Sequence, residues 1–285
     1  MYRIHDNFVM GKDEAHKAAA RNRIIAARQH QVELVTAARA DDEHKFVFHI
    51  YQACVDTFPD MPPAHLTRLM YLATFSGYNG NLIGDNHKAL TKSIIQKKMG
   101  LSKPVFYKFW DDMVSRGILV DEGVSVYLNK DIFFKGQMTN QMIASYQKSN
   151  STVTRIYIKG IRELYEKATV SSHATLSYLF RVLPFVNHQH NIVCTNPFET
   201  DVQEIRAMTL GEFADIIGYD RRHIRRLMRQ LFDTTFMVGD KETRAINFTF
   251  GKDMSNEEMK LYINPSVYYA GDYDEKVEIL KAFFK

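Results

Sequence analysis

Cysteines are scarce in this sequence and stand far apart. Only Cys54 and Cys194 occur among 285 residues, and neither has a second cysteine or a suitably spaced histidine with which to build a metal site. We interpret both as buried thiols, which behave as small hydrophobic side chains. His188 and His190 form a pair without further obvious ligands, which indicates a polar loop. The sequence therefore predicts no metal and no cofactor.

Long apolar runs and cleavable leaders are missing as well. No stretch reaches the roughly 18 apolar residues that a membrane span needs, and no signal peptide opens the chain. We therefore expect no membrane partner and a cytoplasmic protein.

Catalytic motifs are also lacking. The sequence has no Walker loop, no nucleophile elbow, no paired Cys/His ligand set and no histidine cluster of the kind that nicking enzymes use. Its 15 tyrosines leave a tyrosine nuclease open, although none lies beside an evident metal-binding pair. We expect that the protein is not an enzyme.

An excess of one charge is missing too. Lys and Arg total 37 against 33 Asp and Glu, which gives a net charge of +4. A surface that binds nucleic acid must then be a local patch and not a coat over the whole molecule.

What the sequence does contain is an internal repeat. Residues 90–119 align without gaps on residues 208–237, at an offset of 118. Each copy predicts a short helix, a glycine-containing turn and a longer helix opened by an N-capping Ser or Asp. This is the helix-turn-helix plan, whose second helix is built to enter the DNA major groove. The matched pairs include Thr91/Thr209, Gly100/Gly218, Ser102/Asp220, Phe106/Ile224, Phe109/Leu227, Trp110/Met228 and Met113/Leu231.

A closing motif repeats after each pair of helices. Residues 127–136 (YLNKDIFFKG) match residues 262–271 (YINPSVYYAG) at an offset of 135, so the second copy has 17 more residues (135 − 118) in between. Alternating stretches such as VSVYL and AINFTF predict strands. A hairpin after a helix-turn-helix is a wing, so each copy predicts a winged-helix module. We assign the extra residues to a longer wing in the second copy.

Matching segments also precede each copy. Residues 45–58 and 155–168 are aromatic-rich and amphipathic, and an apolar helix is predicted after each, at 66–75 and 175–185. The fold class is therefore mainly α with small β-wings (α+β), as two tandem winged helix-turn-helix modules preceded by a long N-terminal helix. The expected boundaries are 1–42 for the N-terminal basic helix, 43–146 for module 1, 147–152 for a polar junction and 152–285 for module 2.

The N-terminal segment differs in kind. Residues 13–40 predict a long helix rich in Ala and Arg, with only a broken apolar stripe. Three interpretations stay open: a helix that packs on module 1, a dimerisation helix, or a basic arm along the DNA backbone. A homodimer is therefore one of the expected partnerships.

An arginine-rich face is predicted on the second helix of module 2. At about 100° per residue, the apolar side chains from Ile224 to Leu231 form one stripe. Arg222, Arg226 and Arg229 fall on the opposite side, with Arg225 at its flank. The planar guanidinium group of arginine forms paired hydrogen bonds to phosphate and to the O6/N7 edge of guanine. These arginines therefore suggest contact with DNA. The simpler interpretation is a basic helix face exposed to solvent.

The corresponding helix of module 1 has different chemistry. Its outward positions are Pro104, Lys108 and Asp111, with Asp112 beside them and Tyr107 on the flank. Module 1 therefore either binds DNA weakly or contacts proteins. In module 2, Lys241 and Arg244 near the GDKE turn are expected at the wing tip. The candidate DNA-binding residues are Arg221, Arg222, Arg225, Arg226, Arg229, Lys241, Arg244, Lys103, Tyr107 and Lys108.

The order of these segments is similar to a known family. An aromatic amphipathic helix, an apolar helix, a helix-turn-helix, a strand and the closing motif follow one another in the RepL-type winged-helix replication initiators of small bacterial plasmids. Residues 263–276 (INPSVYYAGDYDEK) match the ending of that family, while Asn129-Lys130 replaces its Asn-Pro. The tandem arrangement also resembles the two-module initiators of iteron plasmids and phage-encoded regulators.

The sequence favours a DNA-binding protein of a plasmid or phage. Module 2 is expected to bind double-stranded DNA, as a replication-origin binder or a transcription regulator that works with the replication or transcription machinery. The alternative is an interaction scaffold whose winged helices contact a polymerase, a replisome or another partner.

Overall fold

The computed structural model describes residues 45–50, 58, 60–137, 153–249, 260–269, 271, 279–280 and 284. The chain divides into two units, Met1–Lys45 and Phe46–Lys285. The helix predicted at 13–40 and the junction predicted at 147–152 lie outside the described residues. The described part is an α+β structure of helices and small antiparallel sheets. None of its helices is long and apolar enough to cross a membrane.

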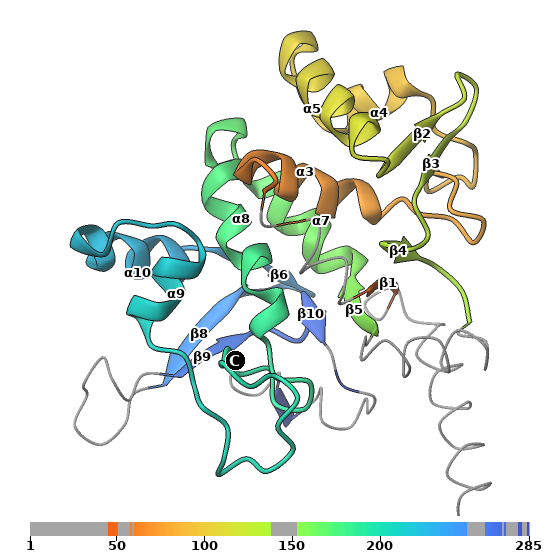
Figure 1. The fold of residues 1–285 in the computed structure, drawn as a ribbon. Helices are drawn as coiled ribbons and strands as arrows, with labels where there is room; N and C mark the ends of the chain where they lie inside the picture. Colours follow the sequence, from red (N-terminus) through yellow and green to blue (C-terminus); the bar gives the residue numbers. More distant parts are fainter. Residues whose placement is uncertain are drawn as a thin grey trace, which may run out of the picture. The chain divides into compact units, whose positions relative to one another are not determined.

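Two halves follow each other along the second unit (Figure 1). We call residues 46–137 the first half and residues 153–271 the second half. The first half contains β1 (Phe46–Ile50), α3 (Pro63–Ala73), α4 (Lys92–Lys98), α5 (Lys103–Ser115), β2 (Leu119–Asp121), β3 (Val126–Leu128) and β4 (Phe133–Phe134).

The second half repeats this order with additions. It contains β5 (Val153–Tyr157), α7 (Ile158–Lys167), η2 (Val170–Ser172), α8 (His173–Arg181), η3 (Leu183–Phe185), α9 (Leu210–Ile216), η4 (Arg221–His223), α10 (Ile224–Phe232), β6 (Thr235–Val238), β7 (Lys241–Arg244), β8 (Ile246–Thr249), β9 (Lys260–Ile263) and β10 (Tyr268–Tyr269).

A four-stranded antiparallel sheet joins the two halves. Its strand order is β10-β5-β1-β4, so the first strand of each half lies in the centre and the last strand of each half at an edge. The central pairing is symmetric about Phe48 and Arg155, which relates the halves by a local two-fold axis. The five central pairs are Phe46↔Tyr157, Val47↔Ile156, Phe48↔Arg155, His49↔Thr154 and Ile50↔Val153.

The strand β1 corrects the sequence prediction. The resemblance places an amphipathic helix at 45–58, but residues 46–50 form a strand, and residues 51–57 lie outside the described part. Val47 and His49 are fully buried while Phe46 and Phe48 are half-buried, which is the period of two that a strand imposes. In the second half, β5 leads directly into α7, so only part of 155–168 is helical.

The helices α3 and α8 pack against each other (Figure 1). The Thr67 hydroxyl donates to the carbonyl oxygen of His173 at 2.7 Å, and Nη2 of Arg181 donates to the carbonyl oxygen of Met61 at 3.1 Å. Buried apolar side chains of both halves belong to one cluster. The described residues of the two halves therefore share one core.

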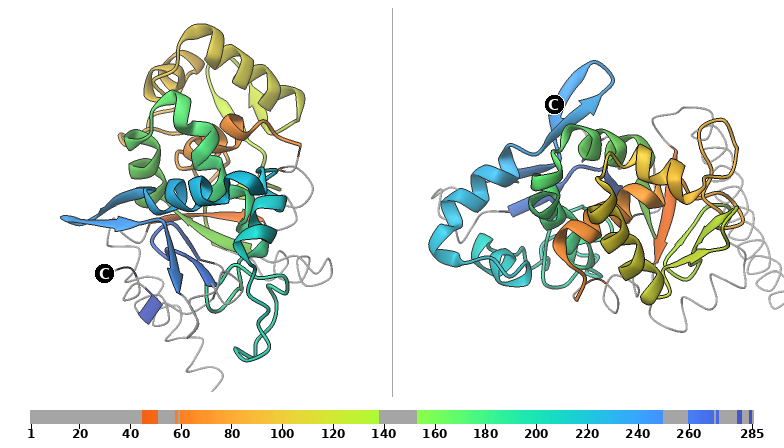
Figure 2. Two further views of the ribbon diagram at one scale, coloured as in Figure 1. Left: turned by 90° about the vertical axis from the view of Figure 1, so that its left-hand side faces the viewer. Right: turned by 90° about the horizontal axis from the view of Figure 1, so that it is seen from above.

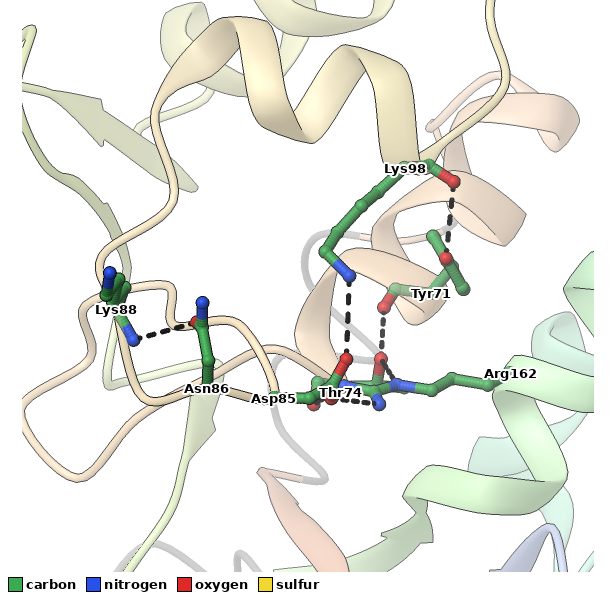
Figure 3. A network of polar contacts seen from close by, with 7 residues as sticks. All are labelled: Tyr71, Thr74, Asp85, Asn86, Lys88, Lys98 and Arg162. Atoms are coloured by element: carbon green, nitrogen blue, oxygen red, sulfur yellow. Dashed lines mark hydrogen bonds and ion pairs between the residues drawn. The ribbon is translucent and has the colours of Figure 1, made fainter.

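Contacts from the second half also hold the helix α4 of the first half (Figure 3). Arg162 on α7 donates to Oγ1 of Thr74 at 3.0 Å and to Oδ1 of Asp85 at 2.7 Å. Lys98 of α4 lies 3.5 Å from the other oxygen of Asp85, and the Tyr71 hydroxyl donates to the carbonyl oxygen of Lys98 at 3.3 Å. This network fixes the C-terminal end of α4 against both α3 and α7.

The closing motif is built in the same way in each half. The side-chain nitrogen of Asn129 donates to the carbonyl oxygen of Gly117 at 3.2 Å, and that of Asn264 donates to the carbonyl oxygen of Arg244 at 2.8 Å. Each asparagine side-chain oxygen also accepts from the backbone N–H two residues further on, at 2.9 Å in both halves. The predicted repeat is thus present in the hydrogen bonding.

The 17 additional residues of the second half are split between two places. Ile246 pairs with Ile263 as Leu119 pairs with Leu128, so β8 corresponds to β2 at an offset of 127 (246 − 119). Nine residues (127 − 118) therefore enter before β8, where they create the hairpin of β6 and β7, which projects from the second half (Figure 2). The other eight (135 − 127) enter between β8 and β9. The expectation of one longer wing is wrong.

Candidate nucleic-acid interface

Capping side chains fix the turn that joins α9 and α10 in the second half. Thr209 and Glu212 form a reciprocal capping box at the start of α9. Gly218 ends that helix with a φ of +69°, a conformation that glycine adopts without strain. Asp220 then caps the next turn, because its carboxylate accepts from the backbone N–H of Arg222 at 2.9 Å. The predicted capping role of Asp220 is confirmed.

The helix α10 presents three arginines to solvent. Leu227 and Leu231 are buried, and the half-buried Ile224 and Met228 pack against the same core, so the predicted apolar stripe is confirmed. Arg225, Arg226 and Arg229 are exposed. Among the described residues these three arginines have no carboxylate partner.

The positive charge of Arg226 acts on Tyr178 of the helix α8. Burial raises the pKa of the Tyr178 hydroxyl, and the positive charges of Arg181 and Arg226 act in the opposite direction. Tyr178 also packs edge-on against Tyr219, with ring centroids 5.7 Å apart. One end of the arginine face is therefore bordered by a tyrosine of α8.

Arg221 and Arg222 differ from the other three arginines. They lie in the 3₁₀ turn η4 and not in the helix itself. Arg221 forms a two-point ion pair with Asp215, and Arg222 does so with Asp220. Hydrogen bonds from these arginines hold the pKa of each carboxyl below its usual value. Arg222 is exposed, as expected of the side opposite the apolar stripe, but it is paired with the carboxylate of the capping residue, a partner that the sequence analysis did not consider.

Lys241 and Arg244 lie on β7 of the inserted hairpin. The guanidinium of Arg244 lies 4.2 Å from the centre of the Phe232 ring, at the base of the hairpin and not at its tip. Lys167 of α7 pairs with Glu242 and so anchors the same hairpin. The structure therefore places both residues outside the hairpin that repeats β2 and β3, and the β8–β9 connection (250–259) lies outside the described residues.

The helix α5 of the first half has a mixed surface. Lys103, Tyr107 and Lys108 are exposed, as predicted, as are Pro104 and Asp111. Its predicted core residues are all buried, namely Phe106, Phe109, Trp110 and Met113.

Asp112 belongs to the protein framework and not to the outward face. Its carboxylate lies 2.6 Å from Nδ1 of His65 on α3 and accepts from Nε of Arg116 at 2.8 Å. The sequence placed Asp112 beside the outward positions, but its contact with His65 turns this carboxylate towards α3.

A cation that the sequence reasoning did not single out completes this surface. Lys97 is exposed at the end of α4 and corresponds to Asp215 at the offset of 118. Lys103 corresponds to Arg221, so two cations occupy the positions of the Asp215–Arg221 ion pair. Comparing the two copies of the repeat at positions before the second helix would have revealed this exchange.

The other candidate groups stay apart from this surface. Cys194 is buried, as expected, and burial raises the pKa of its thiol to about 11. His188 stacks on Phe198 with ring centroids 4.7 Å apart. Within the described ranges, no cluster of three or more His, Cys, Asp or Glu side chains could hold a metal ion. No family model, curated protein or solved structure matches this chain.

Proposed function

We propose that the chain binds double-stranded DNA through two winged helix-turn-helix modules. The support is the order of helix, glycine turn, second helix and antiparallel hairpin in each half. In such a module the second helix lies in the major groove, and the hairpin flanks it. The recognition helices would be α5 and α10.

The observation that carries this proposal is the arginine face of α10. Arg225, Arg226 and Arg229 are exposed on a helix of nine residues without a carboxylate partner in the described part of the chain. Like charges so close together repel one another, and an anionic ligand relieves that repulsion. Guanidinium forks match phosphate and the O6/N7 edge of guanine. Duplex DNA supplies both groups.

The two halves would have different tasks on the DNA. The symmetric pairing of β1 with β5 supports this division, because it relates the two halves locally, and α5 and α10 would then act as the two recognition helices of one molecule. The second half would read bases through its three arginines. The first half, with Lys97, Lys103 and Lys108 exposed, would mainly contact phosphates, which position a protein without reading sequence.

The biological setting rests on the resemblance to replication initiators. Marking a replication origin or regulating transcription, in a plasmid or a phage, would each use such a reader. A scaffold that binds a polymerase or replisome is the second candidate. It is favoured by exposed apolar side chains in the first half, where Val120 and Val124 are 52% and 79% exposed.

The proposal is tested by binding of the whole chain to a mixed-sequence duplex over a range of salt. Six cations that have no carboxylate partner among the described residues, three in each half, predict a slope of log K against log salt of about −5, from roughly −0.9 per phosphate neutralised. Fluorescence anisotropy measures this slope. Lack of binding at low salt, or binding that salt does not weaken, contradicts the proposal and favours the scaffold.

A further inference from the structure

Two carboxylates surround the turn between α9 and α10. Asp215, near the C-terminal end of α9, accepts from Nε of Arg221 at 2.8 Å and pairs with its Nη2. A Cβ placed on Gly211 would lie 3.5 Å from the Arg221 guanidinium, in ordinary van der Waals contact. Gly211 and Asp215 are four residues apart on one face of α9. The guanidinium of Arg221 therefore lies along α9, towards its own protein.

Asp220 has the same relation to Arg222. Its carboxylate accepts from Nε at 2.9 Å and from Nη2 at 2.6 Å, and it also caps the backbone N–H of Arg222. The Arg222 side chain is nevertheless 85% exposed. Arg222 is thus open to solvent just before α10, yet it is held by the carboxylate of Asp220 in the same turn.

The first half has no such arrangement. Ser102 stands in place of Asp220, and Lys97 stands in place of Asp215. The corresponding turn of the first half therefore carries two cations where the second half has a neutral pair. The carboxylates that pair with arginines at this turn therefore occur in the half with the arginine-rich helix.

We propose that Asp215 and Asp220 are specificity-determining residues, which hold Arg221 and Arg222 back from DNA phosphates. This inference rests on the proposed function and deepens it. With these two arginines paired, α10 would approach DNA with Arg225, Arg226 and Arg229, which have no carboxylate partner in the described part of the chain.

The physical reason is that phosphates are the same in every sequence. An additional arginine–phosphate contact raises affinity for all duplexes alike, whereas a contact to a base edge distinguishes between them. A carboxylate competes with phosphate for the same guanidinium fork and also repels the DNA backbone. Restraining two peripheral arginines lowers non-specific binding and leaves base contacts from α10 in place. The ratio of specific to non-specific affinity rises.

The test uses the full chain with Asp215→Asn or Asp220→Asn and a mixed-sequence duplex of about 30 base pairs, roughly three helical turns. Both changes remove the charge and keep the side-chain shape, and asparagine also caps helices well. We expect each variant to bind this duplex severalfold more tightly at low salt. The salt slope should steepen by about one for each arginine released.

Two control variants separate a released arginine from a simple change in net charge. Asp233→Asn changes the charge by the same amount at the other end of α10, where the carboxylate has no arginine partner among the described residues; its salt slope should match wild type. Adding Arg221→Ala to Asp215→Asn should abolish the gain. Unchanged binding in Asp215→Asn and Asp220→Asn, or a gain that survives Arg221→Ala, overturns the inference. Failure of the wild type to bind any duplex refutes the proposed function instead.

Discussion

Replacing Arg225, Arg226 and Arg229 together with alanine is expected to weaken binding to the preferred duplex about a hundredfold or more. All three side chains are exposed, and the core contacts of α10 come from Leu227 and Leu231 on its other side. The thermal unfolding midpoint should therefore stay close to that of the wild type. Gel shifts at fixed salt, together with circular dichroism melts, measure the two quantities.

A lysine version of the same variant is the matched control. Lysine keeps the charge at all three positions but lacks the two-pronged fork that matches guanine. We expect this variant to bind a mixed-sequence duplex nearly as well as the wild type, while the alanine variant does not. Wild-type affinity in the alanine variant would show that α10 is not the reading helix.

Gly160→Ala is expected to destabilise the protein by about 1–3 kcal/mol, the usual cost of overpacking. Gly160 lies in the first turn of α7, where an added Cβ would meet the carbonyl oxygen of Ser266 well inside van der Waals contact. Ser266 belongs to the closing motif held by Asn264. The helix would have to move away from this backbone. Urea denaturation measures the change in the free energy of unfolding.

Gly211→Ala provides the comparison, because Gly211 also lies in a helix. Its added Cβ would only touch the flexible end of Arg221. Alanine in a helix is better than glycine by roughly 0.5–1 kcal/mol, so this variant should be as stable as the wild type or more so. Equal stability of Gly160→Ala and Gly211→Ala would contradict the close packing of α7 on the closing motif.

Local patterns were enough to predict the repeat and the buried sides of α5 and α10. The spacing of Phe106, Phe109, Trp110 and Met113 matches one side of a helix, and all four are buried. Periodicity identifies such residues because burial of a helix side depends only on residues three and four apart. The α+β class and the capping role of Asp220 were also predictable, because both depend on residues close together in the sequence.

Features that depend on distant partners were not predictable. The strand β1 is short, and only pairing with β5 and β4 shows that residues 46–50 are extended. The position of the inserted hairpin depends on the register Ile246↔Ile263, which residues far apart in sequence determine together. The ion pairs of Arg221 and Arg222 depend on how the turn after Gly218 directs those side chains. Helix spacing placed Arg222 on the exposed side correctly, but it could not show that Asp220 pairs with it.

The most direct test of the central claim is selection of bound sequences from a random pool of duplexes. The wild-type chain should enrich a motif with guanines in the half-site that α10 would contact, since three arginines without a carboxylate partner in the described ranges are exposed there. The variant with lysine at positions 225, 226 and 229 should lose that guanine preference while it still retains duplexes. A pool without any enriched motif, or the same motif from both proteins, would contradict sequence reading by α10.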